Sequence, residues 1–182
     1  SADLLACTGA ELEVGWLPVI LAQSGNAAIQ AGQPGQFFAA PHVTMLEKPA
    51  ALDRSAGDVH ADGNPHIQTD PHNIARVGEA LAARMATLDP AEAAGYRARW
   101  ADFSARWNAA VARWEKEAAP LRGVPVVVQH KAFPYLQNWL GLKEVAVLEP
   151  KPGVEPSLAS LAAVKAKLAA TPAKLVLRAA YQ

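Results

Sequence analysis

The fold class is decided by the stretch EKEAAPLRGVPVVVQH, residues 115–130, and by the segments on either side of it. Pro120 and Gly123 end a long helical pattern. The β-branched run over 124–129 that follows is typical of a strand buried on both faces of a parallel sheet. Strand-like and helical segments alternate upstream and downstream of this run, which indicates an α/β protein with a largely parallel sheet.

The remaining elements follow from periodicity and from helix-start signals. The Asp-Pro pairs at 70–71 and 89–90 each predict a helix start, because Asp can cap free backbone N–H groups and Pro needs no donor in the first turn. We expect helices over 12–23, 71–88, 91–119, 133–140 and 157–169, and strands over 4–8, 43–46, 124–129, 145–148 and 175–179. Residues 26–42 and 49–66 are predicted to be loops, and long loops of this kind often carry function.

The longest expected helix, 91–119, carries an aromatic stripe opposite a charged face. Its large apolar residues recur every three or four positions: Tyr96, Trp100, Phe103, Trp107, Val111 and Trp114. Such a stripe could form a platform for a ligand, but an apolar stripe at helical spacing usually faces the core. We therefore interpret it as a packing surface.

Composition excludes several classes of function. The 182 residues carry 17 Lys plus Arg against 17 Asp plus Glu, whereas binding to nucleic acid phosphates needs uncompensated basic clusters. We therefore predict no nucleic-acid partner. No apolar run approaches the roughly 20 residues of a membrane span, and the chain does not open like a signal peptide. The single Cys7 lies in an apolar segment and is interpreted as structural. Phosphate-loop, dinucleotide-turn and nucleophile-elbow motifs are missing from the sequence.

The five histidines are the informative polar residues. Neutral imidazole is a common zinc ligand, and a site assembled from loops at strand ends requires no short sequence spacing. Composition alone favours an ordinary surface or core role for each histidine, and we keep that interpretation for His42 and His72. His130 follows the carboxyl end of the strand expected at 124–129, where open α/β sheets bind ligands.

The order of several motifs resembles one known family. These motifs are GAELEVGWL at 9–17, GNPH at 63–66, TDPHN at 69–73, LDP at 88–90, His130 after the valine-rich strand, and LEPKPGVEPS at 148–157. Together they resemble the zinc- and manganese-binding solute-binding proteins of ABC importers, of the ZnuA/TroA type. The resemblance covers nearly the whole chain in collinear order.

The resemblance implies two α/β lobes joined by one long rigid helix, with a metal ion held between the lobes. On this basis 1–90 is the N-terminal lobe, 91–119 the linking helix and 120–182 the C-terminal lobe. It also implies metal binding by His66 and His130. Zinc-specific members carry a loop rich in His and acids, and His60 falls there with Asp58 and Asp62, so His60 is a candidate auxiliary ligand. The implied activity is non-catalytic delivery of the metal to a membrane permease from the periplasm.

The chain also departs from the family pattern. The family's first metal histidine lies upstream of the segment matched by 4–8, and its terminal acidic ligand lies beyond the segment matched by 175–179. We therefore expect a fragment in which both lobes and the metal site are incomplete. Incomplete sheets leave strand edges that tend to pair with other chains, so self-association is expected.

Two other functions stay open at this point. The first is a zinc enzyme that uses His66 and His130 as ligands and Glu149 or Glu11 as a general base, although catalytic zinc usually has three protein ligands. The second is an interaction module whose histidines are incidental. Among metals, an imidazole-rich site favours zinc, whereas manganese prefers more carboxylate oxygens.

Overall fold

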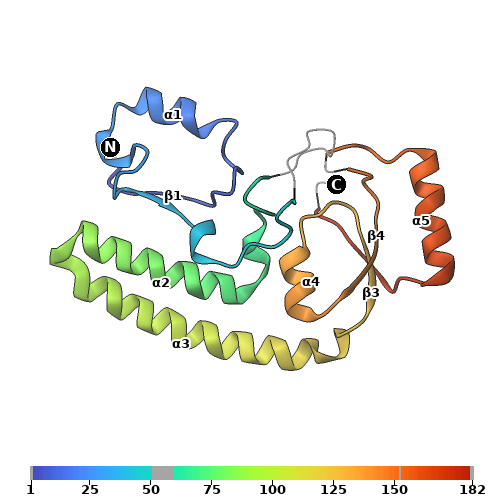
Figure 1. Cartoon of the computed structure of the whole chain (residues 1–182). Coiled ribbons are helices and arrows are strands. Elements are labelled where there is room, and N and C mark those ends of the chain that lie inside the picture. The colour runs from blue at the N-terminus through green and yellow to red at the C-terminus, as the bar shows by residue number, and fades with distance from the viewer. Residues whose placement is uncertain (1, 51–59, 152, 181–182) are drawn as a thin grey trace.

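The computed structural model describes residues 2–50, 60–151 and 153–180. It confirms an α/β fold of two lobes joined by one long helix (Figure 1). Helix α3 (Ala93–Ala118) runs along α2 (Pro71–Leu88) and continues to the start of the second lobe. None of the helices in the described ranges is both long and apolar enough to cross a membrane.

The first lobe is built on a pair of parallel strands. Strand β1 (Leu5–Cys7) pairs with β2 (Gln36–Phe38), in the register Leu5↔Gln36. Helix α1 (Leu17–Ser24) packs against this pair through a small apolar core whose members are Leu17, Leu21 and Ile29, with Leu5, Cys7 and Phe38 against them. Burial, and after it the charge of Glu13, raises the pKa of the Cys7 thiol, which agrees with a structural role for this residue.

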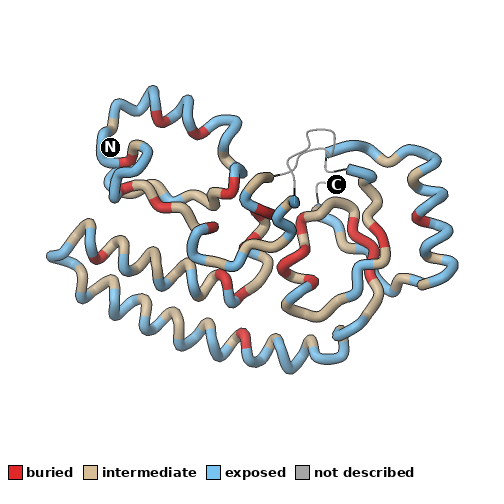
Figure 2. The backbone as a smooth tube through the Cα atoms, viewed as in Figure 1, coloured by how far each residue is buried: buried red, intermediate tan, exposed pale blue. Residues whose placement is uncertain are grey.

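The second lobe contains three parallel strands in the order β4-β3-β5. They are β3 (Pro125–Val128), β4 (Lys143–Val147) and β5 (Leu175–Leu177), and the lobe also holds helices α4 (Pro134–Leu140) and α5 (Leu158–Ala170). Val126, Val127 and Val128 are at most 2% exposed, as expected for a central strand, and Figure 2 shows this part of β3 as buried. The predicted buried strand is therefore confirmed.

Both Asp-Pro helix starts are present. The Asp70 carboxylate accepts a hydrogen bond from the backbone N–H of His72, and the Asp89 carboxylate accepts one from Glu92. Short 3-10 turns precede and follow the long helices, at Ile67–Thr69, Pro90–Glu92 and Ala119–Leu121. Local capping chemistry thus sets where α2 begins, and it sets the start of the 3-10 turn Pro90–Glu92 that leads into α3.

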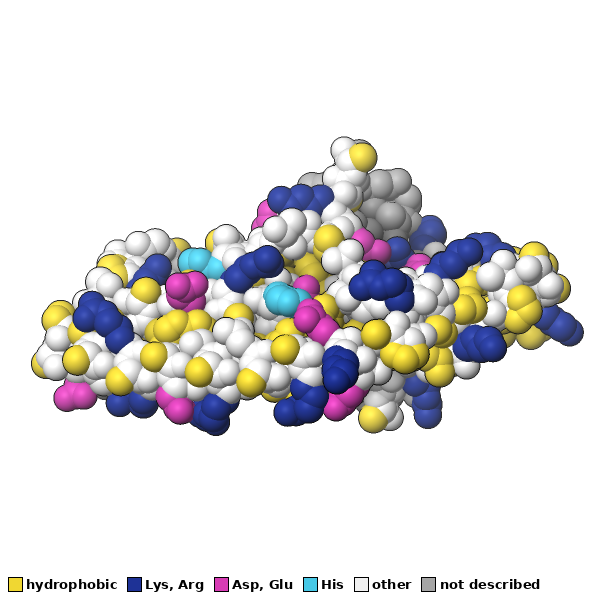
Figure 3. All heavy atoms as spheres, turned by 90° about the horizontal axis from the view of Figure 1, so that it is seen from below, with side chains coloured by type: hydrophobic (Ala, Val, Ile, Leu, Met, Phe, Trp, Pro, Cys, Tyr) yellow, Lys and Arg dark blue, Asp and Glu magenta, His cyan; other side chains and the backbone are white. Residues whose placement is uncertain are grey.

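The aromatic stripe of α3 packs against α2. The Trp107 indole N–H donates a hydrogen bond to the carbonyl of Pro71 at 2.8 Å, and Gly78 of α2 lies against the Trp100 ring. The opposite face of α3 carries the ion pairs Arg106–Asp102 and Arg113–Glu117. Basic and acidic side chains are interspersed over the face of the molecule shown in Figure 3.

Two sequence-based assignments in the first lobe were wrong. No strand forms over 43–46; the second strand instead lies at Gln36–Phe38, inside the segment expected to be a loop. The first helix begins at Leu17 rather than at residue 12, because residues 10–16 form turns. Those turns are held by the Glu13 carboxylate, which accepts the backbone N–H groups of Thr8 and Gly9. The division into 1–90, 91–119 and 120–182 stays a prediction.

Candidate metal centre

His66 and His130 meet between the two lobes. His66 immediately precedes the 3-10 turn Ile67–Thr69 that leads into α2, and His130 follows the carboxyl end of β3. Their ring centroids are 5.9 Å apart and the rings are inclined by 74°. The fold therefore brings together the two histidines singled out in the sequence, one from each side of the linking helix.

The δ nitrogen of each ring faces a hydrogen-bond acceptor. His66 Nδ1 lies 2.9 Å from the Asn64 amide oxygen, and His130 Nδ1 lies 2.7 Å from Glu149 Oε2. Because an ionised carboxylate and an amide oxygen can only accept, Nδ1 carries the proton in both rings. The unprotonated Nε2 atoms are then the ones with a lone pair for a metal ion, the usual arrangement for metal-binding histidine.

The surroundings of His66 favour its neutral form. Burial lowers the pKa of His66, and the nearby His130 and His60 lower it further, against a smaller opposing effect of Glu47. A metal ion binds neutral imidazole, so a lowered pKa keeps His66 available to metal at pH values where an ordinary histidine would begin to protonate.

The other histidines have different surroundings. His60 is close enough to affect the pKa of His66, and its segment is held by the Glu11 carboxylate, which accepts the N–H of Ala61 at 2.7 Å. His42 stacks on Phe37, and His72 pairs with Asp70 and Glu115, in agreement with ordinary structural roles.

Residues 2–50, 60–151 and 153–180 contain no cluster of three or more His, Cys, Asp or Glu side chains arranged to hold a metal. His66 and His130 thus form a two-histidine pair, and His60 as an auxiliary ligand stays a prediction. Asp58, which we associated with His60 in the sequence, lies outside the described residues.

Sequence reasoning missed a polar network that joins the lobes beside this pair. Lys131 Nζ lies 2.8 Å from Glu47 Oε1, and the Tyr135 hydroxyl donates to the Asn64 carbonyl at 2.7 Å. Burial lowers the pKa of Lys131, but its hydrogen bond and ion pair with Glu47 outweigh that effect, so the pKa is raised overall. Lys131 directly follows His130, and Asn64 lies in the GNPH motif before His66, so two members of the network neighbour the candidate ligands in the sequence.

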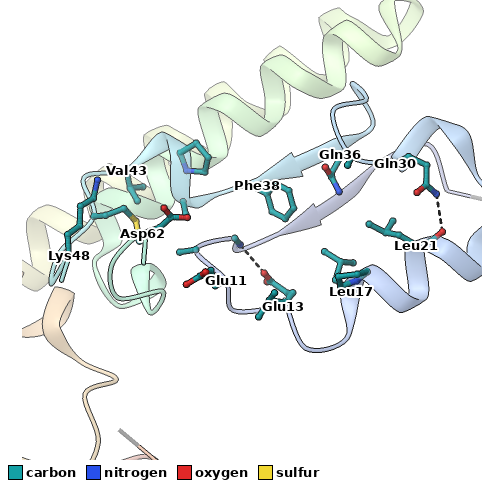
Figure 4. A pocket seen from close by; sticks show the side chains of 18 of the residues that line it. Glu11, Glu13, Leu17, Leu21, Gln30, Gln36, Phe38, Val43, Lys48 and Asp62 are labelled. Atoms are coloured by element: carbon teal, nitrogen blue, oxygen red, sulfur yellow. Dashed lines mark hydrogen bonds between the residues drawn. The ribbon is translucent and has the colours of Figure 1, made fainter. Parts of the chain in front are cut away.

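A separate cavity of about 840 Å³ lies in the first lobe, between α1 and the segment after β2. Its walls are mainly apolar, and Figure 4 shows Leu17, Leu21 and Phe38 facing this space, with Lys48 and Asp62 near one end. Among the described residues that line it, neither His66 nor His130 appears. The cavity is therefore distinct from the paired histidines.

Two α/β lobes joined by one long helix, with a histidine from each lobe meeting between them, are the architecture of a solute-binding protein for metal ions. The sequence matches, over residues 1–181, the family ZnuA, described as zinc-uptake complex component A, periplasmic, and the chain belongs to this family. Members of the family are metal-binding, periplasmic solute-binding proteins of ABC importers. A sequence search of curated proteins found no significant match.

Solved structures agree with the fold. A crystal structure of ZnuA superposes with a TM-score of 0.69 at 20% identity, over 97% of this chain and 71% of that one. The nickel-bound protein FpvC from P. aeruginosa gives 0.65 at 23% identity, over 96% and 58%. A manganese-bound mutant of a periplasmic metal-binding protein from Candidatus Liberibacter asiaticus gives 0.72 at 17% identity, over 96% and 60%. The chain thus spans about three fifths to seven tenths of the length of these structures.

Proposed function

We propose that this chain is the metal receptor of an ABC importer, that zinc is its cargo, and that His66 and His130 bind the ion. The observation that carries the proposal is the pairing of these two rings, with centroids 5.9 Å apart and each Nδ1 already hydrogen-bonded. Zinc fits this pair better than manganese does, because imidazole suits zinc and manganese prefers a larger share of carboxylate oxygens.

A metal ion bound by both rings would connect the two lobes. An ion that binds the arrangement with the lobes together, and not the separated arrangement, shifts the population towards the former. In our proposal this is the form that a membrane permease receives in the periplasm. Zinc in proteins usually has about four ligands, so His66 and His130 supply about half of a site, and His60, water or another molecule would complete it.

The carboxylates near the histidines support a receptor rather than a hydrolytic enzyme. Glu149 Oε2 accepts hydrogen bonds from His130 Nδ1 and from the N–H of Gly153, and Glu11 Oε2 accepts one from Ala61. A general base must reach the proton that it removes. Both candidate bases have structural partners instead, so the proposal is non-catalytic.

Calorimetric titration of the metal-stripped chain with zinc tests the proposal. We expect one zinc ion per chain and at least a tenfold loss of affinity in each of His66→Ala and His130→Ala, which is the lower end of the roughly tenfold to hundredfold effects seen even for partners of metal ligands. His72→Ala is the matched control, because it removes a partly exposed imidazole that pairs with Asp70 and Glu115. Zinc affinity that is the same in all three variants and the unsubstituted chain would contradict the proposal.

A further inference from the structure

We propose that Asn64 is a positioning residue that fixes His66 relative to His130 by bonding to both lobes at once. The proposal rests on the proposed function of the histidine pair as a metal site. Asn64 lies two residues before His66, and its side-chain amide also reaches the segment that carries His130. Asn64 therefore connects the segment that carries one histidine to the segment that carries the other.

The oxygen side of the amide orients His66. Asn64 Oδ1 accepts hydrogen bonds from the His66 backbone N–H at 3.0 Å and from His66 Nδ1 at 2.9 Å. A backbone N–H can only donate, so the atom that faces it must be the amide oxygen. Both the backbone and the ring of His66 are therefore held by one atom.

The nitrogen side of the same amide holds the other lobe. Asn64 Nδ2 donates to the carbonyl of Lys131 at 2.7 Å and to Glu47 Oε2 at 3.0 Å. Lys131 is adjacent to His130 in the chain, so this bond fixes the backbone next to the second ring. A second contact reinforces it, because the Lys131 ammonium pairs with the other oxygen of Glu47.

The backbone of Asn64 is fixed as well, which makes the amide a rigid connection. Its N–H donates to the Leu46 carbonyl at 2.8 Å, and its carbonyl accepts from the hydroxyl of Tyr135, a residue only 2% exposed. The preceding Gly63 has φ of 106°, and a Cβ there would lie 2.7 Å from the Leu46 carbonyl oxygen. Only glycine allows this close approach without strain.

Positioning of this kind affects metal affinity without contact with the metal. Partners that orient metal-binding histidines typically contribute about tenfold to a hundredfold to affinity. If the Lys131 bond is lost, the contacts made by Tyr135 and by the Lys131 ammonium remain, but the two rings are held less closely before binding, and the ion must order them at an entropic cost. The separation of the rings in the metal-free chain is thus the property that Asn64 controls.

The variant Asn64→Asp keeps the acceptor role of the amide oxygen and removes the donor role of the amide nitrogen. It keeps the shape and the acceptor for His66, but it places a carboxylate oxygen against the Lys131 carbonyl and Glu47. The double variant Asn64→Asp with Glu47→Gln removes the repulsion between carboxylates without restoring the bond to Lys131. Glu47→Gln alone is its reference, because it shows the cost of the Lys131–Glu47 ion pair that the double variant also loses. The matched control is Asn26→Asp, because Asn26 likewise donates to a backbone carbonyl, that of Ala2, and accepts from a backbone N–H, that of Ala28.

Two measurements test the positioning role of Asn64 at about pH 7.5, where an ordinary histidine is neutral. The first is NMR of the metal-free chain, which reports the tautomer of His66 and the contact between the His66 and His130 ring protons. The second is zinc affinity by calorimetry. For Asn64→Asp we expect the Nδ1–H tautomer to persist, the contact between the rings to weaken, and affinity to fall about tenfold to a hundredfold. The double variant should remain weakened, and Asn26→Asp should match the unsubstituted chain.

Several results would overturn the proposal. They are an absence of contact between the rings in the unsubstituted chain, an unchanged contact in Asn64→Asp, or full recovery in the double variant, which would leave charge repulsion as the whole effect. Should Asn64→Asp not fold, Asn64→Ala, which adds no charge, is judged by the same contact between the rings. If the unsubstituted chain binds no zinc, the proposed function fails, while the metal-free NMR measurement still judges the role of Asn64.

Discussion

Replacing Glu149 with Gln tests whether this carboxylate prepares His130 for the proposed metal ion. Glu149 Oε2 lies 2.7 Å from His130 Nδ1, and the two side chains are only 16% and 24% exposed. The carboxylate holds the proton on Nδ1 and fixes the orientation of the ring, which leaves Nε2 with the lone pair for a metal ion. Glu149→Gln keeps a hydrogen-bond acceptor of the same length but removes the negative charge.

The expected loss of zinc affinity depends on whether the variant removes the charge of Glu149 or its hydrogen-bond acceptor as well. Loss of such a partner weakens metal binding by about tenfold to a hundredfold. Because Gln can still accept the hydrogen bond, we expect the lower end, about tenfold or roughly 1.4 kcal/mol. Glu149→Ala removes both the charge and the acceptor, so its loss should approach the upper end of that range.

Zinc calorimetry at about pH 7.5, above the ordinary pKa of histidine, is the assay, and Glu144→Gln is the control. Glu144 lies on β4 in the same lobe and accepts a hydrogen bond from Gln137, so its replacement removes the same charge without contact with His130. Equal zinc affinities for Glu149→Gln and Glu144→Gln would refute the reasoning about His130.

Three further predictions concern stability and assembly. The Tyr135 hydroxyl bridges two backbone groups, and a buried group left without a partner costs about 1–3 kcal/mol, so Tyr135→Phe should lower the free energy of unfolding in urea by about that much. A similar loss in Tyr96→Phe, whose hydroxyl donates to the Asp89 carboxylate, would contradict this. The pKa of His66 is lowered in the folded chain, so below about pH 6.5 the unfolded chain binds more protons than the folded chain. The free energy of unfolding therefore decreases as the pH is lowered. His66→Gln should make the urea midpoint depend less on pH. The midpoints are measured from about pH 7.5 to about pH 5.5, on either side of the pKa of histidine in the unfolded chain, and a dependence equal to that of the unsubstituted chain would contradict the prediction. Val19 and Ile20 on α1 are 58% and 53% exposed, so we expect self-association that Ile20→Glu weakens; sedimentation of the unsubstituted chain as a clean monomer would exclude it.

The elements with strong local signals were predicted closely. The helix expected over 91–119 is observed at Ala93–Ala118, because Asp89 and Pro90 start the 3-10 turn that leads into it and Pro120 lies in the turn that follows it. The valine run likewise identified β3. Strand β2 was missed because its three residues lie in a segment rich in Gly, Pro and Gln, and they become a strand only by pairing with β1.

The candidate site was likewise predictable where it depends on local sequence and not where it depends on contacts between distant segments. Motif order identified His66 and His130, but their contact depends on packing of the lobes, which no spacing in the sequence reveals. Asn64 and Tyr135 were missed for a related reason. Their partners include backbone atoms of segments about 70 residues away, and a backbone acceptor leaves no mark in a sequence.

The strand order β4-β3-β5 has a consequence for how the second lobe assembles. Pairing β3 with β4 closes a loop of about 18 residues, whereas pairing β3 with β5 closes one of about 49, at an extra entropic cost of about 0.9 kcal/mol. The β3–β4 pair should therefore form first during folding. Its ladder continues into the bond from the Glu149 N–H to the Gln129 carbonyl, so that early step already places Glu149 beside His130. One half of the proposed metal centre would then be assembled before the last strand arrives.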